Sequence, residues 1–285
     1  MVAATATVAR MPHLLDGVVS AQISPLPYPH LVVQPVLPAD IYERLNAEFP
    51  SLAFILNGRI DYGNNEAVRL CAKQVLDDRR ISTLWRDFFA FHTSADYWHN
   101  IVTLFGPYFR TAFPGLEMRM GRRFEDWRVI PRGFSGEAEV RLDCQFVMNT
   151  PVIQRSSVKT PHIDVCDKIF SGLFYFRDPA DEVGGGDLNI YAWKRAPRFI
   201  KHRAMERDIA LSETVRYSAN TYLCFVNSQQ SVHGVSPRDV TTFPRRYINL
   251  IAELPLNVFR PRQLNKLQRV LHASDVRAAM NEERY

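Results

Sequence analysis

Residues 169–176 read Ile169-Phe170-Ser171-Gly172-Leu173-Phe174-Tyr175-Phe176, a short apolar run rich in aromatic residues. This length and composition are typical of a buried strand. The chain repeats such segments on both sides, at residues 140–146, 188–193, 221–226 and 247–251. Turn sequences separate them, and the clearest is Gly184-Gly185-Gly186-Asp187. Many short strands at close spacing predict a β-sandwich or a β-barrel.

The segment before residue 114 has a different periodicity. Residues 38–45 have the composition of a helix start, and apolar residues recur every three or four positions in residues 65–78 and 82–113. These stretches predict two or three amphipathic helices. Their large aromatic residues are expected in the core rather than at a cofactor: Trp85, Phe88, Phe89 and Phe105. Residues 116–120 alternate between apolar and polar, which predicts a strand.

The predicted class is therefore mainly β with helices (α+β). We expect an extended lead-in over residues 1–37, a helical layer over 38–115, a β core over 116–257, and a C-terminal helix and tail over 258–285, with the helix at residues 261–272. A chain of 285 residues with 46% apolar content can bury a substantial core.

Composition argues against several classes of partner. The net charge of +5 and the 23% of charged residues do not require nucleic acid or an anionic membrane. We find no signal peptide and no apolar run of about 18 residues. The four cysteines, Cys71, Cys144, Cys166 and Cys224, form no Cys-x-x-Cys pair, and we expect them to be reduced. These features predict a cytoplasmic protein without a nucleic-acid or membrane partner; they leave its oligomeric state undetermined.

One segment is strongly basic. Residues 194–207 contain six Lys and Arg residues and a single acidic residue, Glu206. Such a segment could form a basic rim for an anionic substrate. It could equally be a solvated loop or a surface helix.

The residues with the clearest chemistry begin at Thr160-Pro161-His162-Ile163-Asp164. On a strand, His162 and Asp164 point to the same face, so both could bind one metal ion. A third ligand of the right type is His233, 69 residues after Asp164. Two histidines and one carboxylate form the ligand set of non-haem Fe(II) oxygenases, although zinc accepts the same donors.

If the metal is iron and 2-oxoglutarate is its cosubstrate, the far carboxylate of that molecule needs a cation. A bidentate arginine suits it best. Arg245 and Arg246 both lie on the strand predicted after His233. Arg246 shares a strand face with the apolar residues Ile248 and Leu250, which favours it as the inward residue. A shift of one residue in register would select Arg245 instead.

The order His162-x-Asp164, His233 and then arginine resembles the Fe(II)/2-oxoglutarate-dependent dioxygenases, and within them the prolyl-hydroxylase-like branch with its bacterial biosynthetic members. Residues 171–179, 184–188 and 220–225 add to the resemblance, which covers about residues 140–253. It implies a double-stranded β-helix (a jelly-roll, cupin-like core). The chain departs from the family at Ile248, where a serine often follows the arginine by two residues.

The resemblance also implies roles for individual residues. His162, Asp164 and His233 would be the catalytic iron ligands and Arg246 would bind the 5-carboxylate. Tyr175 would hydrogen-bond 2-oxoglutarate unless it only packs in the core, and Gln145 is a weaker candidate for the same contact.

The implied activity is hydroxylation of an unactivated C–H bond, with Fe(II) as cofactor and with 2-oxoglutarate and O2 as cosubstrates. Desaturation or ring formation would use the same ligands. We expect a small-molecule substrate or a sugar or polysaccharide precursor, which the basic segment allows to be anionic. A prolyl or other protein side-chain hydroxylase and a catalytically silent binding protein are the alternatives.

Overall fold

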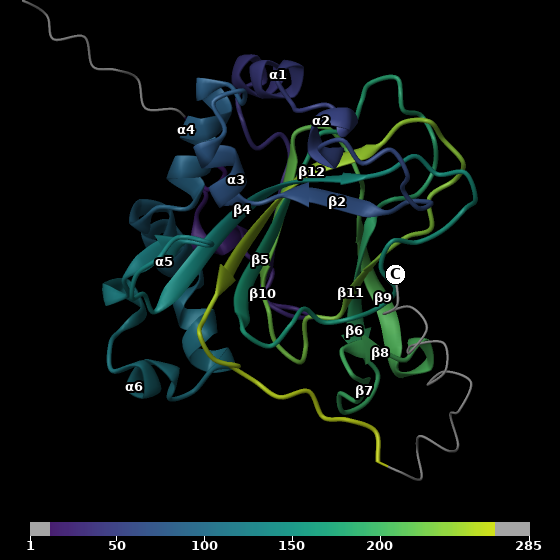
Figure 1. Ribbon diagram of the computed structural model, residues 1–285. Helices are drawn as coiled ribbons and strands as arrows, with labels where there is room; N and C mark the ends of the chain where they lie inside the picture. Colours follow the sequence, from purple (N-terminus) through teal and green to yellow (C-terminus); the bar gives the residue numbers. More distant parts are fainter. Residues whose placement is uncertain (1–11, 266–285) are drawn as a thin grey trace, which may run out of the picture.

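The computed structural model describes residues 12–265 of the chain. Two β-sheets face each other, and helices cover the outer face of the larger one (Figure 1). The strands of the larger sheet are β1 (His30–Val33), β2 (Ala67–Leu70), β3 (Val129–Pro131), β4 (Val140–Asn149), β5 (Lys168–Tyr175), β10 (Thr221–Val226) and β12 (Arg245–Glu253). The smaller sheet consists of β6 (Leu188–Trp193), β9 (Ile209–Val215) and β11 (His233–Val235). A separate hairpin pairs β7 (Phe199–Ile200) with β8 (Arg203–Ala204).

The strand order identifies the fold. The larger sheet runs β1-β10-β5-β12-β4-β2 and the smaller one runs β11-β6-β9. The chain crosses between the sheets after β5, returns from β9 to β10, and crosses again to β11 and back to β12. Antiparallel strands wound alternately through two facing sheets form a double-stranded β-helix, which is the predicted fold.

Alternation along the strands separates two buried regions. On β4, Leu142, Cys144 and Phe146 belong to the large apolar core beneath the helices. A second apolar cluster, which includes Tyr175 and Leu223, is formed by residues from both sheets. The larger sheet therefore has one face toward the helices and one toward the barrel interior.

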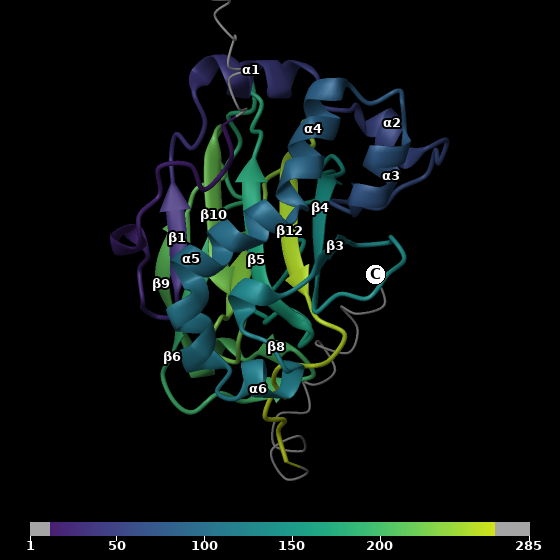
Figure 2. The ribbon, with the colours of Figure 1, turned by 90° about the vertical axis from the view of Figure 1, so that its left-hand side faces the viewer.

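The helices are α1 (Ala39–Ala47), α2 (Leu52–Leu56), α3 (Ala72–Asp77), α4 (Thr83–His92), α5 (Ala95–Ala112) and α6 (Leu116–Met120). Short 3-10 turns lie at Ser20–Gln22, Phe124–Asp126 and Glu206–Asp208. Figure 2 shows α5 lying across the sheet, over β10 and β5. Ser82 and Ser94 begin α4 and α5 by accepting hydrogen bonds from main-chain N–H groups three residues later.

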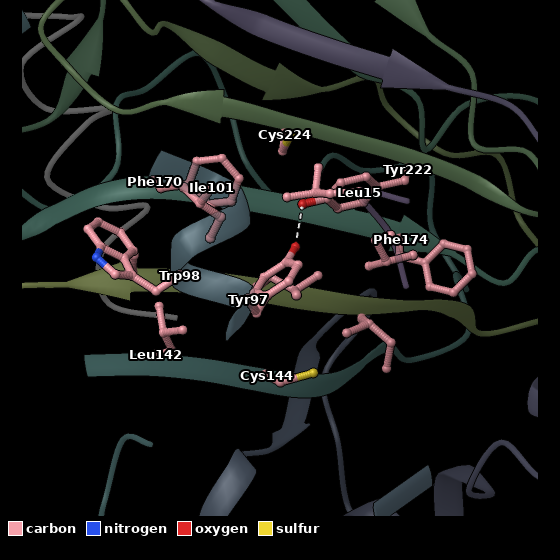
Figure 3. Packing of buried hydrophobic residues seen from close by; sticks show 14 of the residues in the cluster. Leu15, Tyr97, Trp98, Ile101, Leu142, Cys144, Phe170, Phe174, Tyr222 and Cys224 are labelled. Atoms are coloured by element: carbon pink, nitrogen blue, oxygen red, sulfur yellow. Dashed lines mark hydrogen bonds between the residues drawn. The ribbon is translucent and has the colours of Figure 1, made fainter. Parts of the chain in front are cut away.

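The helical layer is fixed to the sheet mainly by aromatic side chains. Trp85, Phe88, Phe89 and Phe105 are all fully buried, as predicted. Polar groups in this core are paired, and the Tyr97 and Tyr222 hydroxyls lie 3.0 Å apart (Figure 3). Cys144 and Cys224 are buried among these residues, and all four cysteines are free thiols, as expected.

Three expectations about the elements were wrong in part or in full. Residues 116–120 form helix α6 and not a strand, between Gly115 and Gly121, which both have positive φ angles. Residues 65–78 contain the edge strand β2 before the short helix α3. Residues 261–265 are not helical, and the rest of the predicted C-terminal helix lies outside the described residues.

The N-terminal regions are joined to the larger sheet by strands of their own. β1 comes from the lead-in and pairs with β10. β2 comes from the helical layer and pairs with β4. Both N-terminal regions thus contribute strands to the larger sheet.

Candidate metal centre and arginine pocket

His162, Asp164 and His233 come together at one end of the barrel, and we call them the metal centre. Main-chain hydrogen bonds join the two histidines: His162 N to His233 O at 2.8 Å and His233 N to His162 O at 2.9 Å. One candidate ligand atom from each of the three residues lies within 4.8 Å of the others. An isolated β-bridge thus holds His162 beside His233, while His162 and Asp164 lie in a loop and not on the strand that was expected.

Hydrogen bonds orient each imidazole. His162 Nδ1 lies 2.8 Å from the Thr160 carbonyl oxygen and His233 Nδ1 lies 2.9 Å from that of Ser231. A carbonyl only accepts, so each Nδ1 carries the proton and each Nε2 has a free lone pair. Both Nε2 atoms lie 4.0 Å from Asp164 Oδ1. The three free donor atoms therefore face one another.

The second carboxylate oxygen of Asp164 is held by the protein. Ser171 donates a hydrogen bond of 2.6 Å to Asp164 Oδ2, and Lys168 Nζ lies 3.6 Å from the same oxygen. One oxygen is thus restrained while Oδ1 remains for a metal ion. Restraint of this kind is common around metal ligands in proteins.

The site keeps its ligands in the forms that bind a metal. Burial lowers the pKa of His162 to about 3, and it also lowers the pKa of His233. Burial alone would raise the pKa of Asp164, but the positive charge of Lys168 and the nearby histidines hold it below its ordinary value. At neutral pH the site therefore has two neutral imidazoles and a carboxylate. These donors fit Fe(II), and they fit zinc as well.

Lys168 reaches this position because of a β-bulge. The register between β5 and β12 shifts between Ala252 and Glu253, so that Lys168 lies opposite Glu253. Glu253 shares a strand face with Ile251, which lies opposite Ser171. The bulge thus turns Lys168 toward the face on which Ser171 holds Asp164.

The inward arginine is Arg245, and the prediction of Arg246 for this position was wrong. Arg246 contacts the helical layer: its Nη2 donates to Asn46 Oδ1 at 3.1 Å and its guanidinium lies over the Phe49 ring. Ile248 and Leu250 belong to the core beneath the helices. An apolar strand face therefore identified the side covered by helices, and Arg245 lies on the opposite side.

Arg245 lies in a pocket of aromatic rings, which we call the arginine pocket. Its side chain is 1% exposed, and its guanidinium carbon lies 4.9, 5.0 and 4.6 Å from the ring centres of Tyr175, Tyr217 and Tyr247. Nε donates to the Gly186 carbonyl at 2.8 Å, and Nη2 has no partner. Within residues 12–265 no carboxylate forms an ion pair with this guanidinium. A buried charge without a counter-charge is unfavourable unless a ligand supplies one.

The register places the arginine pocket and the metal centre on the same inner surface. Tyr247 lies opposite Tyr175, and Ile251 lies opposite Ser171, the residue that holds Asp164. The four residue steps from Ser171 to Tyr175 along β5 span about 13 Å. The two features are therefore a short distance apart along the barrel.

The two weaker candidates also lie in this region. The Tyr175 hydroxyl is buried without a hydrogen-bond partner. Burial raises its pKa to about 12 although Arg245 opposes the shift, so the hydroxyl stays protonated and can donate. Gln145 is already paired: it donates to Asp143 at 2.6 Å and accepts from Asn249 at 3.2 Å. Tyr175 is thus free for a ligand, whereas Gln145 lies in an internal polar row.

Sequence reasoning did not single out Ser171 and Lys168, which contact Asp164, or the buried Arg238, which lies beside Arg245. Ser171 lies inside the quoted apolar run, where a lone polar residue on an inward face was a usable signal. Lys168 required knowledge of the bulge. Arg238 follows a Ser-Pro turn, and nothing in the sequence distinguishes it from a surface arginine.

Comparisons with known proteins gave only distant likenesses. No protein-family model matches the chain, and no curated protein matches it. A Pseudomonas putida prolyl-4-hydroxylase structure is similar with a TM-score of 0.41 and 14% identity, over 82% of this chain and 98% of that one. A Phytophthora capsici prolyl 4-hydroxylase gives 0.45 and 14%, over 89% and 68%. A Trichoplax adhaerens prolyl hydroxylase, solved with a hypoxia inducible factor peptide fragment, gives 0.41 and 11%, over 85% and 86%.

At such TM-scores and identities, these likenesses do not assign an activity. Separately, none of the helices between residues 12 and 265 combines the length and the apolar character that crossing a membrane requires.

Proposed function

We propose that the chain is an Fe(II)- and 2-oxoglutarate-dependent dioxygenase that hydroxylates a small molecule. One observation carries the proposal: a His-Asp-His group with free donor atoms shares a barrel interior with a buried arginine that lacks an acidic partner. The first feature suits a metal ion and the second suits an anion. A molecule with a chelating keto acid at one end and a carboxylate at the other satisfies both.

Each residue has a defined task in this proposal. His162, Asp164 and His233 would hold the iron, and Ser171 would keep Asp164 in position. When bound, Fe(II) and 2-oxoglutarate would supply the activation of O2 and the oxidation of a C–H bond, with succinate and CO2 as co-products. Arg245 would bind the far carboxylate through its free Nη2, with the Tyr175 hydroxyl as a second donor. The surrounding aromatic rings would exclude water from this pair.

Charged side chains lie on the side of Asp164 that the protein holds. Lys168 and Glu253 lie opposite each other near Asp164, and Arg132 Nε lies 3.1 Å from Glu253 Oε1. A small molecule with charged groups suits these surroundings, and a sugar precursor is one such class. A prolyl or other protein side chain is the alternative substrate class.

An anaerobic titration tests the proposal. Fe(II) and 2-oxoglutarate are added to the wild type while the visible absorption of the iron chelate is recorded. We expect a band that is lost in His162→Ala and Asp164→Ala. Arg245→Gln should weaken 2-oxoglutarate binding about a hundredfold, because a buried charge partner is removed. Arg246→Gln is the matched control and should change it by less than about twofold, since this arginine faces the helices.

Two results would contradict the proposal. Absence of a band in the wild type would leave a structural site or another metal. An equal effect of the two arginine variants would remove the assignment of the arginine pocket. If the band forms, turnover of 2-oxoglutarate in the presence of metabolites or of proline-rich peptides separates the two substrate classes. If neither the metabolites nor the peptides lead to succinate formation, the chain would be a catalytically silent binding protein.

A further inference from the structure

A second buried arginine lies beside the first. Arg238 is 1% exposed, and its guanidinium carbon lies 5.6 Å from the centre of the Tyr217 ring that Arg245 also contacts. Both side chains flank Gly186: a β-carbon on this glycine would lie 3.3 Å from Arg245 Cδ and 3.5 Å from Arg238 Cδ. The two arginines therefore run past the same point of the chain.

Arg238 has only part of its donors in use. Its Nη2 donates to the buried Asp181 Oδ2, whereas Nε and Nη1 have no partner. Four other buried atoms without partners occur in neighbouring residues: the donors Arg245 Nη2, Tyr175 Oη and Asn149 Nδ2, and the acceptor Asp181 Oδ1. Asn149 lies directly opposite Arg245 on β4, so these atoms gather around one pocket. All but Asp181 Oδ1 can donate, and an acceptor-rich ligand would satisfy this excess of donors.

The charged groups around the Tyr217 ring also favour an anionic ligand. Asp181 can neutralise one of the two guanidiniums, and Asp187 accepts a hydrogen bond from the Tyr217 main-chain N–H. Arg177 also contacts the Tyr217 ring, but its N–H groups are used by the carbonyl oxygens of Asp181, Tyr217 and Val183. Of the three arginines that contact this ring, Arg238 and Arg245 thus have buried N–H groups without a hydrogen-bond partner.

We propose that Arg238 is a second ligand-binding residue of the arginine pocket and holds the far carboxylate of the cosubstrate together with Arg245. This inference rests on the proposed function. Asp181 accepts a hydrogen bond from one end of the Arg238 guanidinium, and the other N–H groups remain for the ligand. Binding from two guanidiniums would make the pocket selective for a keto acid with a carboxylate at its far end.

The test compares two ligands that differ only in that carboxylate. Dissociation constants of 2-oxoglutarate and 2-oxopentanoate are measured by calorimetry on the full chain loaded with Mn(II). The wild type should bind 2-oxoglutarate far more tightly, and the ratio of the two constants is the readout. Arg238→Gln should lower this ratio about ten- to hundredfold, which corresponds to the loss of charge-assisted hydrogen bonds. Arg238→Lys keeps the charge and loses the fork, so it should give an intermediate ratio.

Two control variants separate binding from structure. Arg177→Gln should leave the ratio at its wild-type value while it lowers the thermal unfolding temperature. Asp181→Asn should keep or raise the ratio, because Arg238 loses its acidic partner and keeps its charge. A wild-type ratio in folded Arg238→Gln or Arg238→Lys protein overturns the inference, as does an equal fall in Arg238→Gln and Asp181→Asn.

Failure of the proposed function gives a different result. If the wild type binds both keto acids equally, the assignment of the arginine pocket to 2-oxoglutarate is wrong. If the wild type discriminates and Arg245→Gln does not, while Arg238→Gln does, only the role of Arg238 is wrong.

Discussion

At the scale of single residues, Ser171 restrains Asp164, one of the three proposed metal ligands. Its hydroxyl holds one oxygen of Asp164 and leaves the other facing His162 and His233. A free carboxylate could rotate and present either oxygen. The hydrogen bond removes this freedom before a metal ion arrives, which lowers the entropy cost of binding.

We therefore expect Ser171→Ala to weaken metal binding about ten- to hundredfold while the protein stays folded. The measurement is calorimetric titration with Mn(II). Ser94→Ala is the control: it removes the cap of α5 and should lower the free energy of unfolding by about 1 kcal/mol without changing metal affinity. Equal metal affinities for wild type and Ser171→Ala would show that the hydrogen bond does not prepare the ligand.

Residue types and spacing located the metal centre but did not choose between the two arginines. His162 and Asp164 were paired by strand alternation alone, and the structure brings His233 to them. For Arg245 and Arg246, apolar neighbours were taken as the sign of the barrel interior. Here the helices cover the apolar face, and the barrel interior carries polar residues such as Asn249 and Gln145. The helical layer determines which face of the strand lies under helices and which faces the barrel interior. The sequence of the strand alone does not contain this information.

At the scale of elements, the turn before β6 is the most constrained segment. Gly185 and Gly186 have φ angles of +83° and +82°. A β-carbon on Gly185 would lie 1.9 Å from the Pro237 carbonyl oxygen. Gly186 offers its carbonyl to Arg245 Nε, so the turn also forms one wall of the arginine pocket. The Gly-rich sequence is needed for close backbone approach and for backbone conformation together.

Gly185→Ala should lower the free energy of unfolding by about 3 kcal/mol or more, since the strain of a positive φ adds to a clash with main chain. Gly17→Ala is a matched control, because Gly17 has a φ of +68° and a β-carbon there would meet nothing within 4 Å. It should cost about 1–2 kcal/mol. Urea unfolding measures both, and equal losses would contradict a steric role for the Pro237 contact.

Elements were predicted best where one periodicity was long and unambiguous. Helix α5 and strands β4, β5 and β10 lie where the sequence placed them. The short segment Leu116–Met120 alternates and also fits one helical turn, and its flanking glycines decided for the helix. The edge strand β2 is only four residues long and owes its form to pairing with β4. Such short elements are determined by their neighbours rather than by their own pattern.

At the scale of the whole molecule, a histidine in the core couples stability to pH. His92 is buried between Phe88 and Tyr97, its Nδ1 lies 2.7 Å from the Phe88 carbonyl, and its Nε2 accepts a hydrogen bond from Leu14 N. Burial lowers its pKa to about 3. Between about pH 6.5 and pH 3, His92 is therefore protonated in the unfolded chain but stays neutral in the folded protein. The free energy of unfolding thus falls as the pH falls.

For His92 this loss should reach about 2 kcal/mol at pH 5. His92→Gln should be less stable than the wild type at pH 7, but it should lose about 2 kcal/mol less between pH 7 and pH 5. Urea unfolding at the two pH values measures this difference. His99→Gln, which changes an exposed histidine nearby, should show the wild-type loss. A wild-type loss in His92→Gln would contradict the assignment to His92.

The register of β5 against β12 has a further consequence: it fixes the spacing between Ser171 and Tyr175 along the barrel. Ser171, which holds Asp164, and Tyr175, which lines the arginine pocket, stand on one strand, and a one-residue insertion between them without a β-bulge would turn every later side chain to the other face. The smallest insertion that preserves the alternation of side chains is two residues, which lengthens the strand by about 6.6 Å. This is more than the change in ligand length that one methylene produces. Insertions and deletions that keep the regular pairing therefore cannot adapt this barrel to a slightly longer or shorter ligand. Substitution of the inward-facing side chains near Ser171 and Tyr175 is the remaining way to do so.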